Sequence, residues 1–171
     1  MGKALRILFA AGLLAGFWGS GCAAAAEPSG CDKFKWPIAH EQAALAAPAA
    51  GPLAPGAALP ADVGTRLKLV PFAEAKLALA PERPPKFSPS FAGAFSLDAP
   101  AAPAVFKVTL SAGGWIDIVQ GGKFLKPSAF SDAAGCANAR KSVKFRLAAE
   151  PTTLQLTGVG DSDGSIIVSP E

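Results

Sequence analysis

The residues best suited to bind a ligand lie in a short β-rich stretch around a Gly-Gly pair. Trp115 and Asp117 alternate along one predicted strand and therefore project from the same face. Lys123 follows Gly121 and Gly122, on a strand that a hairpin would place beside the first. An aromatic plane, a carboxylate and an ammonium group together suit a sugar or another polar small molecule. The alternative is structural: Trp115 packs in the core, while Asp117 and Lys123 form a cross-strand pair.

Arg140 and Lys141 form a second candidate group, at the start of a later predicted strand. Two adjacent cations can hold an anion through charge and hydrogen bonds. The same pair is also typical of a strand start that faces solvent, so both interpretations stay open. The predicted ligand-binding residues are Trp115, Asp117, Lys123, Arg140 and Lys141.

Residue counts argue against a catalytic or metal centre. The chain has one histidine, His40, whereas a non-haem iron triad needs two. A Ser-His-Asp triad would also depend on His40, which lies in a predicted helix beside a spacer. Residues 161–164 begin like a calcium loop, but no closing glutamate follows, and an Asp/Gly hairpin turn is favoured. We therefore predict no catalytic residue, no metal and no cofactor.

The N-terminal segment has the features of an export signal. A short basic start precedes an apolar stretch, residues 7–18, that is too short to span a bilayer as a helix. Residues 1–26 are therefore predicted to be a signal peptide, cleaved between Ala26 and Glu27. Cys22 offers an alternative, because a cysteine after small residues at the end of such a stretch can be lipidated. We expect a periplasmic or secreted protein without a transmembrane helix, or one anchored to the membrane through Cys22.

Cys31 and Cys136 remain after either form of processing. An even number of cysteines in an oxidising compartment is typical of disulfide bonds, and here the number is two. We therefore predict a bond that ties the N-terminal region to a loop between two late strands. Two unrelated thiols are the alternative. Two cysteines and one histidine provide too few ligands for a closed zinc site.

The charge balance argues against a nucleic-acid partner. The chain has 16 Lys and Arg against 13 Asp and Glu, and removal of Lys3 and Arg6 with the signal peptide leaves 14 against 13. A nucleic-acid surface needs several cations on one face to neutralise phosphates, and the sequence has no basic cluster. We therefore predict no binding to nucleic acid.

Short stretches of alternating apolar and polar residues predict an all-β domain. The clearest are residues 105–110, 142–147 and 153–157. Gly121 and Gly122 predict a type I′ hairpin, and the Ala/Pro connection at 99–104 predicts a crossing between sheets. Eight or nine short strands from residue 66 onward predict a two-sheet antiparallel sandwich, jelly-roll-like or Ig-like. Each strand should keep one face in the core and one in water.

The rest of the chain is predicted to be less regular. Residues 38–46 favour a short helix, and residues 47–60, rich in Ala, Pro and Gly, favour an extended or mobile spacer. Residues 73–79 suit a strand or a helix, and the Pro-rich residues 81–86 favour a rigid loop over a polyproline ligand for a partner. The predicted division is a signal peptide (1–26), a helix with a spacer (27–62) and a β-sandwich domain (63–171).

Two sets of motifs resemble known groups of exported proteins. Residues 31–37 and 69–77, with the strands from Phe106 onward, resemble a family of small exported bacterial proteins of unknown function, some of which are labelled homogentisate 1,2-dioxygenase. That enzyme family uses a His and Glu iron site, and one histidine cannot build it. The C-terminal half is similar to bacterial pre-peptidase C-terminal β-sandwiches, which accompany secreted enzymes and are not catalytic. This chain departs from them in having no attached peptidase.

Together these features predict a non-catalytic exported β-sandwich that serves as a binding or accessory module. The expected partner is a polar small molecule, a glycan or an envelope protein, bound on the face that carries Trp115, Asp117 and Lys123. A small metal-dependent enzyme and a membrane-anchored structural lipoprotein are the alternatives.

Overall fold

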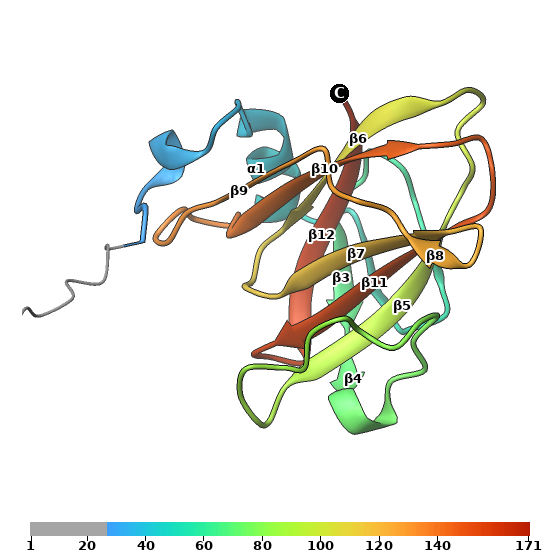
Figure 1. Cartoon of the computed structure of the whole chain (residues 1–171). Helices are drawn as coiled ribbons and strands as arrows, with labels where there is room; N and C mark the ends of the chain where they lie inside the picture. Colours follow the sequence, from blue (N-terminus) through green and yellow to red (C-terminus); the bar gives the residue numbers. More distant parts are fainter. Residues whose placement is uncertain (1–26) are drawn as a thin grey trace, which may run out of the picture.

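Two β-sheets face each other across an apolar core, and one short helix lies near the N-terminus (Figure 1). This computed structural model describes residues 27–171. The predicted signal peptide, the lipidation site Cys22 and the Ala26 side of the cleavage site lie outside the described residues. The predicted two-sheet sandwich with an N-terminal helix is confirmed.

Sheet 1 has the strand order β1-β3-β12-β6-β10-β9. Its neighbouring strands are antiparallel except β1 and β3, which run parallel at one edge. Its strands are β1 (Ala50–Leu53), β3 (Thr65–Lys68), β6 (Ala104–Leu110), β9 (Ala129–Asp132), β10 (Lys141–Leu147) and β12 (Asp163–Pro170).

Sheet 2 has the order β2-β5-β11-β7-β8, and β4 also pairs with β5. One edge pair, β2 with β5, is again parallel, and the other pairs are antiparallel. The predicted antiparallel pairing therefore holds except for one edge pair in each sheet. Its strands are β2 (Ala58–Leu59), β4 (Val70–Pro71), β5 (Phe91–Leu97), β7 (Trp115–Gln120), β8 (Lys123–Phe124) and β11 (Thr152–Val159).

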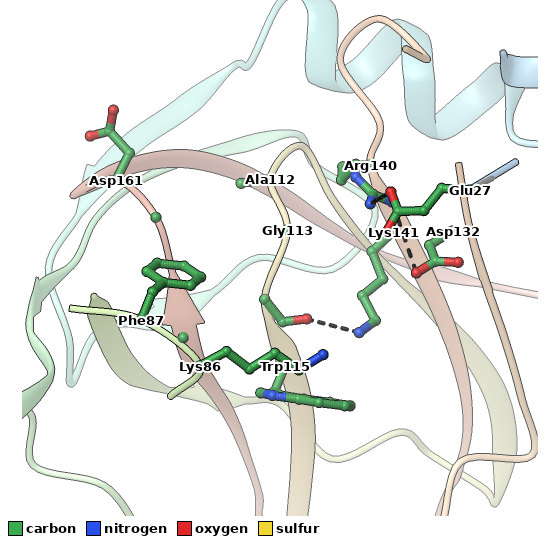
Figure 2. Close-up of a pocket in the computed structure, with 13 residues that line it drawn as sticks. Glu27, Lys86, Phe87, Ala112, Gly113, Trp115, Asp132, Arg140, Lys141 and Asp161 are labelled. Carbon is green, nitrogen blue, oxygen red and sulfur yellow. Dashed lines mark hydrogen bonds and ion pairs between the residues drawn. The ribbon is translucent and has the colours of Figure 1, made fainter. Parts of the chain in front are cut away.

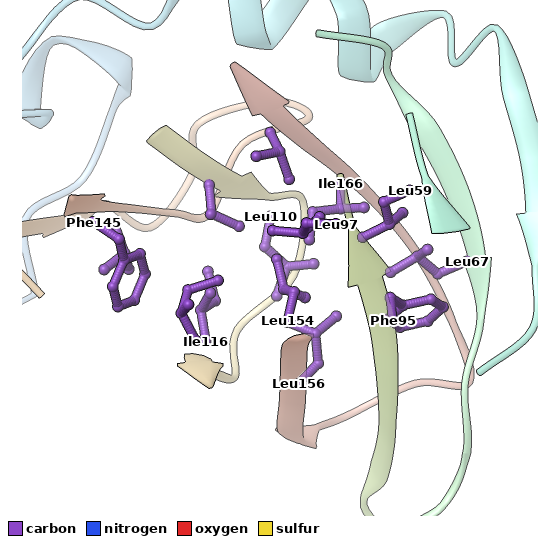
Figure 3. Close-up of a cluster of buried hydrophobic side chains, with 14 of the residues drawn as sticks. Leu59, Leu67, Phe95, Leu97, Leu110, Ile116, Phe145, Leu154, Leu156 and Ile166 are labelled. Carbon is purple, nitrogen blue, oxygen red and sulfur yellow. The ribbon is translucent and has the colours of Figure 1, made fainter. Parts of the chain in front are cut away.

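Apolar side chains from both sheets meet in one continuous core (Figure 3). Leu110 and Phe145 enter it from sheet 1, and Phe95, Ile118 and Leu154 enter it from sheet 2; all five are almost completely buried. Every second residue of each strand points inward because side chains alternate across a pleated sheet. The inward faces predicted from the sequence are therefore the core faces.

Two predicted connections are confirmed. Gly121 and Gly122 have φ values of 56° and 72°, and Gln120 pairs with Lys123 across them, as a type I′ hairpin requires. The Ala/Pro connection after β5 leads from sheet 2 to β6 in sheet 1, so it does cross between the sheets.

The predicted spacer at residues 47–60 is wrong, because this stretch supplies an edge strand to each sheet. Strand β1 pairs with β3, and β2 pairs with β5. An edge strand needs only its backbone groups to pair, so it can form without the alternating pattern of a central strand. Leu59 is buried in the core and Leu53 packs against it, which holds both edges in place.

The strand considered for residues 73–79 does not form. The chain makes a short 3-10 helix, η2 (Phe72–Glu74), and then runs without regular structure to β5. The backbone N–H of Phe72 donates to the carbonyl of Ser90 at 2.9 Å, which closes the base of this long loop. The Pro-rich residues 81–86 lie within this loop, as predicted.

The N-terminal segment covers the outer face of sheet 1, so the prediction that this face is in water is wrong for the central strands. Thr109 on β6 and Ser142 on β10 are fully buried, and their hydroxyl groups lie 2.9 Å apart. The indole N–H of Trp36 donates to Ser142 Oγ at 3.2 Å. The polar side chains of this face thus bond to a covering segment instead of to water.

Helix α1 (Ala39–Ala46) adds a buried ion pair to the same face. Lys107 Nζ lies 2.6 Å from Glu41 Oε1, and Ser169 Oγ donates to that oxygen at 2.6 Å. Burial alone would raise the pKa of Glu41, but the hydrogen bonds from Lys107 and Ser169 outweigh it and hold the pKa below its ordinary value of 4.5. No helix among residues 27–171 is long and apolar enough to cross a membrane.

The predicted disulfide between Cys31 and Cys136 is present, with Cα atoms 4.6 Å apart. It joins the short 3-10 helix η1 (Cys31–Lys33) to the loop between β9 and β10. Phe34, Ile38 and other apolar residues of the segment pack around it in a second small core, separate from the main one. The disulfide and this small core together hold the N-terminal segment against sheet 1.

Replacing Cys31 and Cys136 together by alanine should lower the free energy of unfolding by about 4 to 5 kcal/mol, because the bond closes a long loop in the unfolded chain. The sequence separation of the two cysteines is 105 residues. Urea unfolding followed by fluorescence measures the change, and a reductant should destabilise the wild type but not the double variant. A loss below about 1 kcal/mol would contradict this account.

Lys107→Met should lower the free energy of unfolding by about 3 to 5 kcal/mol, because it leaves the Glu41 carboxylate buried without a cation. Combining it with Glu41→Gln should recover most of that loss, since the amide can still accept from Ser169. Urea unfolding of the two variants at pH 7 measures both changes. Equal losses in the single and the double variant would show that the ion pair itself is not responsible.

Candidate ligand-binding site

A cleft of about 550 Å³ opens where the first residues of β7 and β10 meet the Pro-rich loop (Figure 2). Three of the predicted binding residues, Trp115, Arg140 and Lys141, line it together. Figure 2 shows Arg140 beside Lys141, whose side chain extends toward Trp115. The other lining residues are Glu27, Lys86, Phe87, Ala112, Gly113, Gly114, Asp132, Gly158, Gly160 and Asp161.

Trp115 lies on the outer face of sheet 2 because its neighbours in β7, Ile116 and Ile118, point into the core. It is partly buried and does not belong to the main core. Gly158 of β11, next to the indole, has a φ of 63° and lies at an irregularity in the β11–β5 pairing. Glycine adopts this conformation without steric cost, so the strand can bulge beside the ring.

Three cationic groups surround the Trp115 ring. Lys141 Nζ is 4.6 Å from its centroid, Arg83 Cζ is 4.7 Å away, and Lys86 Nζ is 6.0 Å away. Within residues 27–171, none of the three forms an ion pair with a carboxylate. The cleft therefore gathers positive charge around an aromatic side chain that attracts cations.

Lys141 is the most enclosed of these cations. Its Nζ donates to the carbonyl oxygen of Gly114 at 2.8 Å. Burial lowers the pKa of Lys141 below its ordinary value of 10.5, and the charges of Arg140 and Lys86 lower it further, while Asp132 and Asp117 oppose them. The surroundings of Lys141 therefore disfavour the charged form of its side chain.

Arg140, the next residue along the chain, is paired differently. Its Nη2 lies 2.8 Å from Glu27 Oε2, and its Nη1 lies 3.8 Å from Asp132 Oδ2 (Figure 2). Asp132 sits on β9, where it is the cross-strand neighbour of Lys141. In the predicted anion-binding pair, Arg140 therefore has carboxylate partners, whereas Lys141 forms no ion pair with a carboxylate among the described residues.

Asp117 shares the outer face with Trp115, as predicted, but it lies next to the cleft and not in its lining. Burial raises the pKa of its carboxyl group above 3.8, and the charge of Glu82 raises it further. The charges of Lys141 and Arg83 act in the opposite direction. Asp117 is therefore coupled to the cleft by charge.

Lys123 does not join Trp115 and Asp117, so the predicted trio is wrong. Its register partner is Gln120, at the opposite end of β7 from Trp115. Directly paired residues share one face, and Gln120 lies on the opposite face of β7 from Trp115 and Asp117. The hairpin prediction was right, but its register places Lys123 on the other face.

The Pro-rich loop is the part of the site that the sequence interpretation missed. It supplies Arg83, Lys86 and the half-exposed Phe87 to the cleft region. Gln155 of β11 holds the loop against sheet 2: its side-chain amide donates to the Leu79 carbonyl at 3.0 Å and accepts from the Leu79 N–H at 3.3 Å. In the sequence, the two basic residues among the prolines were the only sign of a binding role. Nothing in the local sequence indicated which strand they would contact.

The other candidate motifs lie apart from the cleft and take part in surface ion pairs. Among residues 27–171, no group of three or more His, Cys, Asp and Glu side chains is placed to bind an ion. Asp163 of the Asp/Gly turn pairs with Lys68 at 2.8 Å, and the turn joins β11 to β12 in different sheets, so it is not a hairpin. His40 Nε2 lies 2.7 Å from Asp62 Oδ1 on the surface.

No protein-family model, curated protein or solved structure matches this chain. The resemblances to small exported bacterial proteins and to pre-peptidase C-terminal domains therefore stay predictions.

The free energy of unfolding of the wild type should decrease as the pH rises and Asp117 ionises, and Asp117→Asn should abolish this decrease. The raised pKa means that the folded protein holds this proton at pH values where the unfolded chain, with a pKa near 3.8, has released it. Wild-type stability should therefore fall, relative to the variant, as pH rises from about 3.8 through the folded pKa. The difference is measured by the urea unfolding midpoints of both proteins from about pH 3.5 to about pH 7, in steps of about half a pH unit. Parallel curves would contradict it.

Proposed function

We propose that this chain is an exported, non-catalytic binding protein whose cleft holds a small organic anion. The observation that carries the proposal is Lys141: a partly buried ammonium group, in a lined cleft, with no carboxylate partner among the described residues. Arg83 and Lys86 approach the same indole ring and add to the positive charge. A carboxylate or phosphate group is the chemistry that this arrangement would recognise.

Energetics support an anion over a neutral ligand. Burial, together with the charges of Arg140 and Lys86, lowers the pKa of Lys141 and outweighs the opposing charges of Asp132 and Asp117. A bound anion would supply the missing partner and would form a charge-assisted hydrogen bond, which contributes about 1.5 to 3 kcal/mol. Trp115 and Phe87 offer apolar surface to the rest of the ligand, and the cleft volume of about 550 Å³ suits a small molecule.

An oxidising compartment is compatible with the Cys31–Cys136 disulfide. Together with the predicted signal peptide, this supports a periplasmic or secreted protein. Lipidation at Cys22 would instead keep the protein at the membrane, and it would leave the cleft residues unchanged.

Lys141→Gln should weaken anion binding at least tenfold, because one charge-assisted hydrogen bond of about 1.5 to 3 kcal/mol is lost. Calorimetric titration at low salt and pH 7 with glutarate, glucuronate and glycerol 3-phosphate measures the affinities.

Lys144→Gln is the matched control. Lys144 lies on the same strand and its Nζ sits 4.5 Å from the centroid of the Trp36 ring, outside the cleft. Its replacement should leave the affinities unchanged. Equal binding to the wild type and to the Lys141 variant, or no binding of any of these anions, would refute the proposal.

A further inference from the structure

Arg140 offers a second position for an anion in the same cleft, and a side chain of the protein occupies it. The Glu27 carboxylate lies 2.8 Å from Arg140 Nη2, and both residues line the cleft with Lys141. Glu27 belongs to the segment that precedes the disulfide, whereas Asp132, the other partner of Arg140, is fixed within β9. The closer of the two carboxylates is therefore the one that is not held in a strand.

The contact between Glu27 and Arg140 is easily exchanged. The Glu27 side chain is 71% exposed, while the Arg140 side chain is only 28% exposed. Ion pairs with such an exposed partner contribute little to stability, so another carboxylate can replace Glu27 at small cost. The guanidinium group has five N–H donors and can keep its contact with Asp132 at the same time.

Arg140 and Lys141 are close enough to act on one ligand. Their Cα atoms are joined by one peptide unit, which spans about 3.8 Å. Their side chains enter the same cleft, where Lys141 extends toward Trp115 and Arg140 turns toward Glu27 and Asp132 (Figure 2). A small molecule with an acid group at each end can therefore meet both cations.

We infer that the ligand is a small organic dianion, with one acid group bound by Lys141 beside Trp115 and the other bound by Arg140 in place of Glu27. This inference rests on the proposed anion-binding function. In the free protein the Glu27 carboxylate occupies the second position and competes with the ligand. Glu27 thus competes with the second acid group of the ligand for Arg140.

Paired ligands test the inference. Succinate, glutarate and adipate would each be titrated against the purified protein, beside the monoamides succinamate, glutaramate and adipamate, which keep one carboxylate. At least one diacid should bind about tenfold or more tightly than its monoamide, because the second charge-assisted contact is lost in the amide. Arg140→Gln should abolish this preference, so that each diacid and its monoamide bind with similar affinity.

Glu27→Gln provides a second measurement, and because the Glu27 side chain is 71% exposed we expect the variant to keep the fold. Removing the competitor should strengthen diacid binding roughly two- to fivefold, as expected for the loss of a surface ion pair. Glu171→Gln is the control, because Glu171 pairs with Lys144 away from the cleft and should have no effect.

The outcomes separate the two proposals. Equal affinity for diacids and monoamides, with both lost in Lys141→Gln, would overturn the dianion and leave the anion-binding function in place. An unchanged affinity in Glu27→Gln would overturn the competitor role. Failure of every diacid and monoamide to bind the wild type would overturn the dianion, and the anion-binding function would fall with it only if glucuronate and glycerol 3-phosphate also fail to bind.

Discussion

Gln155 bonds through both ends of its side-chain amide to the backbone of Leu79, and the cleft depends on this contact. The residue is completely buried on the outer face of sheet 2, where an amide without partners would be costly. Meeting that requirement fastens the long loop between η2 and β5 across the sheet. The loop then brings Arg83 and Lys86 to the Trp115 ring and forms one wall of the cleft.

The same constraint operates on sheet 1. There the buried hydroxyl of Ser142 accepts from the Trp36 indole, and Lys107 meets Glu41 beneath helix α1. A buried donor or acceptor is costly without a partner, so these polar contacts help to determine which segment covers which sheet. The disulfide reinforces the arrangement by holding the covering segment at its start. Part of each outer face of the sandwich is thereby covered, and the cleft lies at the border of one covering loop.

The candidate site was only partly predictable because its residues come from different sheets. Trp115 begins β7 in sheet 2, and Lys141 begins β10 in sheet 1, so no local spacing relates them. Each was recognisable alone, as an aromatic residue on an outward face and as one of two adjacent cations. Lys123 was assigned to the wrong face because the pattern predicted the hairpin correctly, but not the consequence of its register. Arg83 was missed because an irregular loop has no periodicity from which its position could be inferred.

The sequence by itself determined the features that depend on local chemistry. Alternation defined the inward faces of strands such as β6 (Ala104–Leu110), and the Gly-Gly pair defined the hairpin. The disulfide joins residues far apart, but it followed from a count, because only two cysteines remain after the predicted processing. Only the tertiary structure decided what covers the outer faces, how the Ala/Pro-rich stretch becomes two edge strands, and which charges share a cleft. These features arise from contacts between segments far apart in the chain. The sequence alone does not distinguish a polar residue that bonds to water from one that bonds to a buried partner.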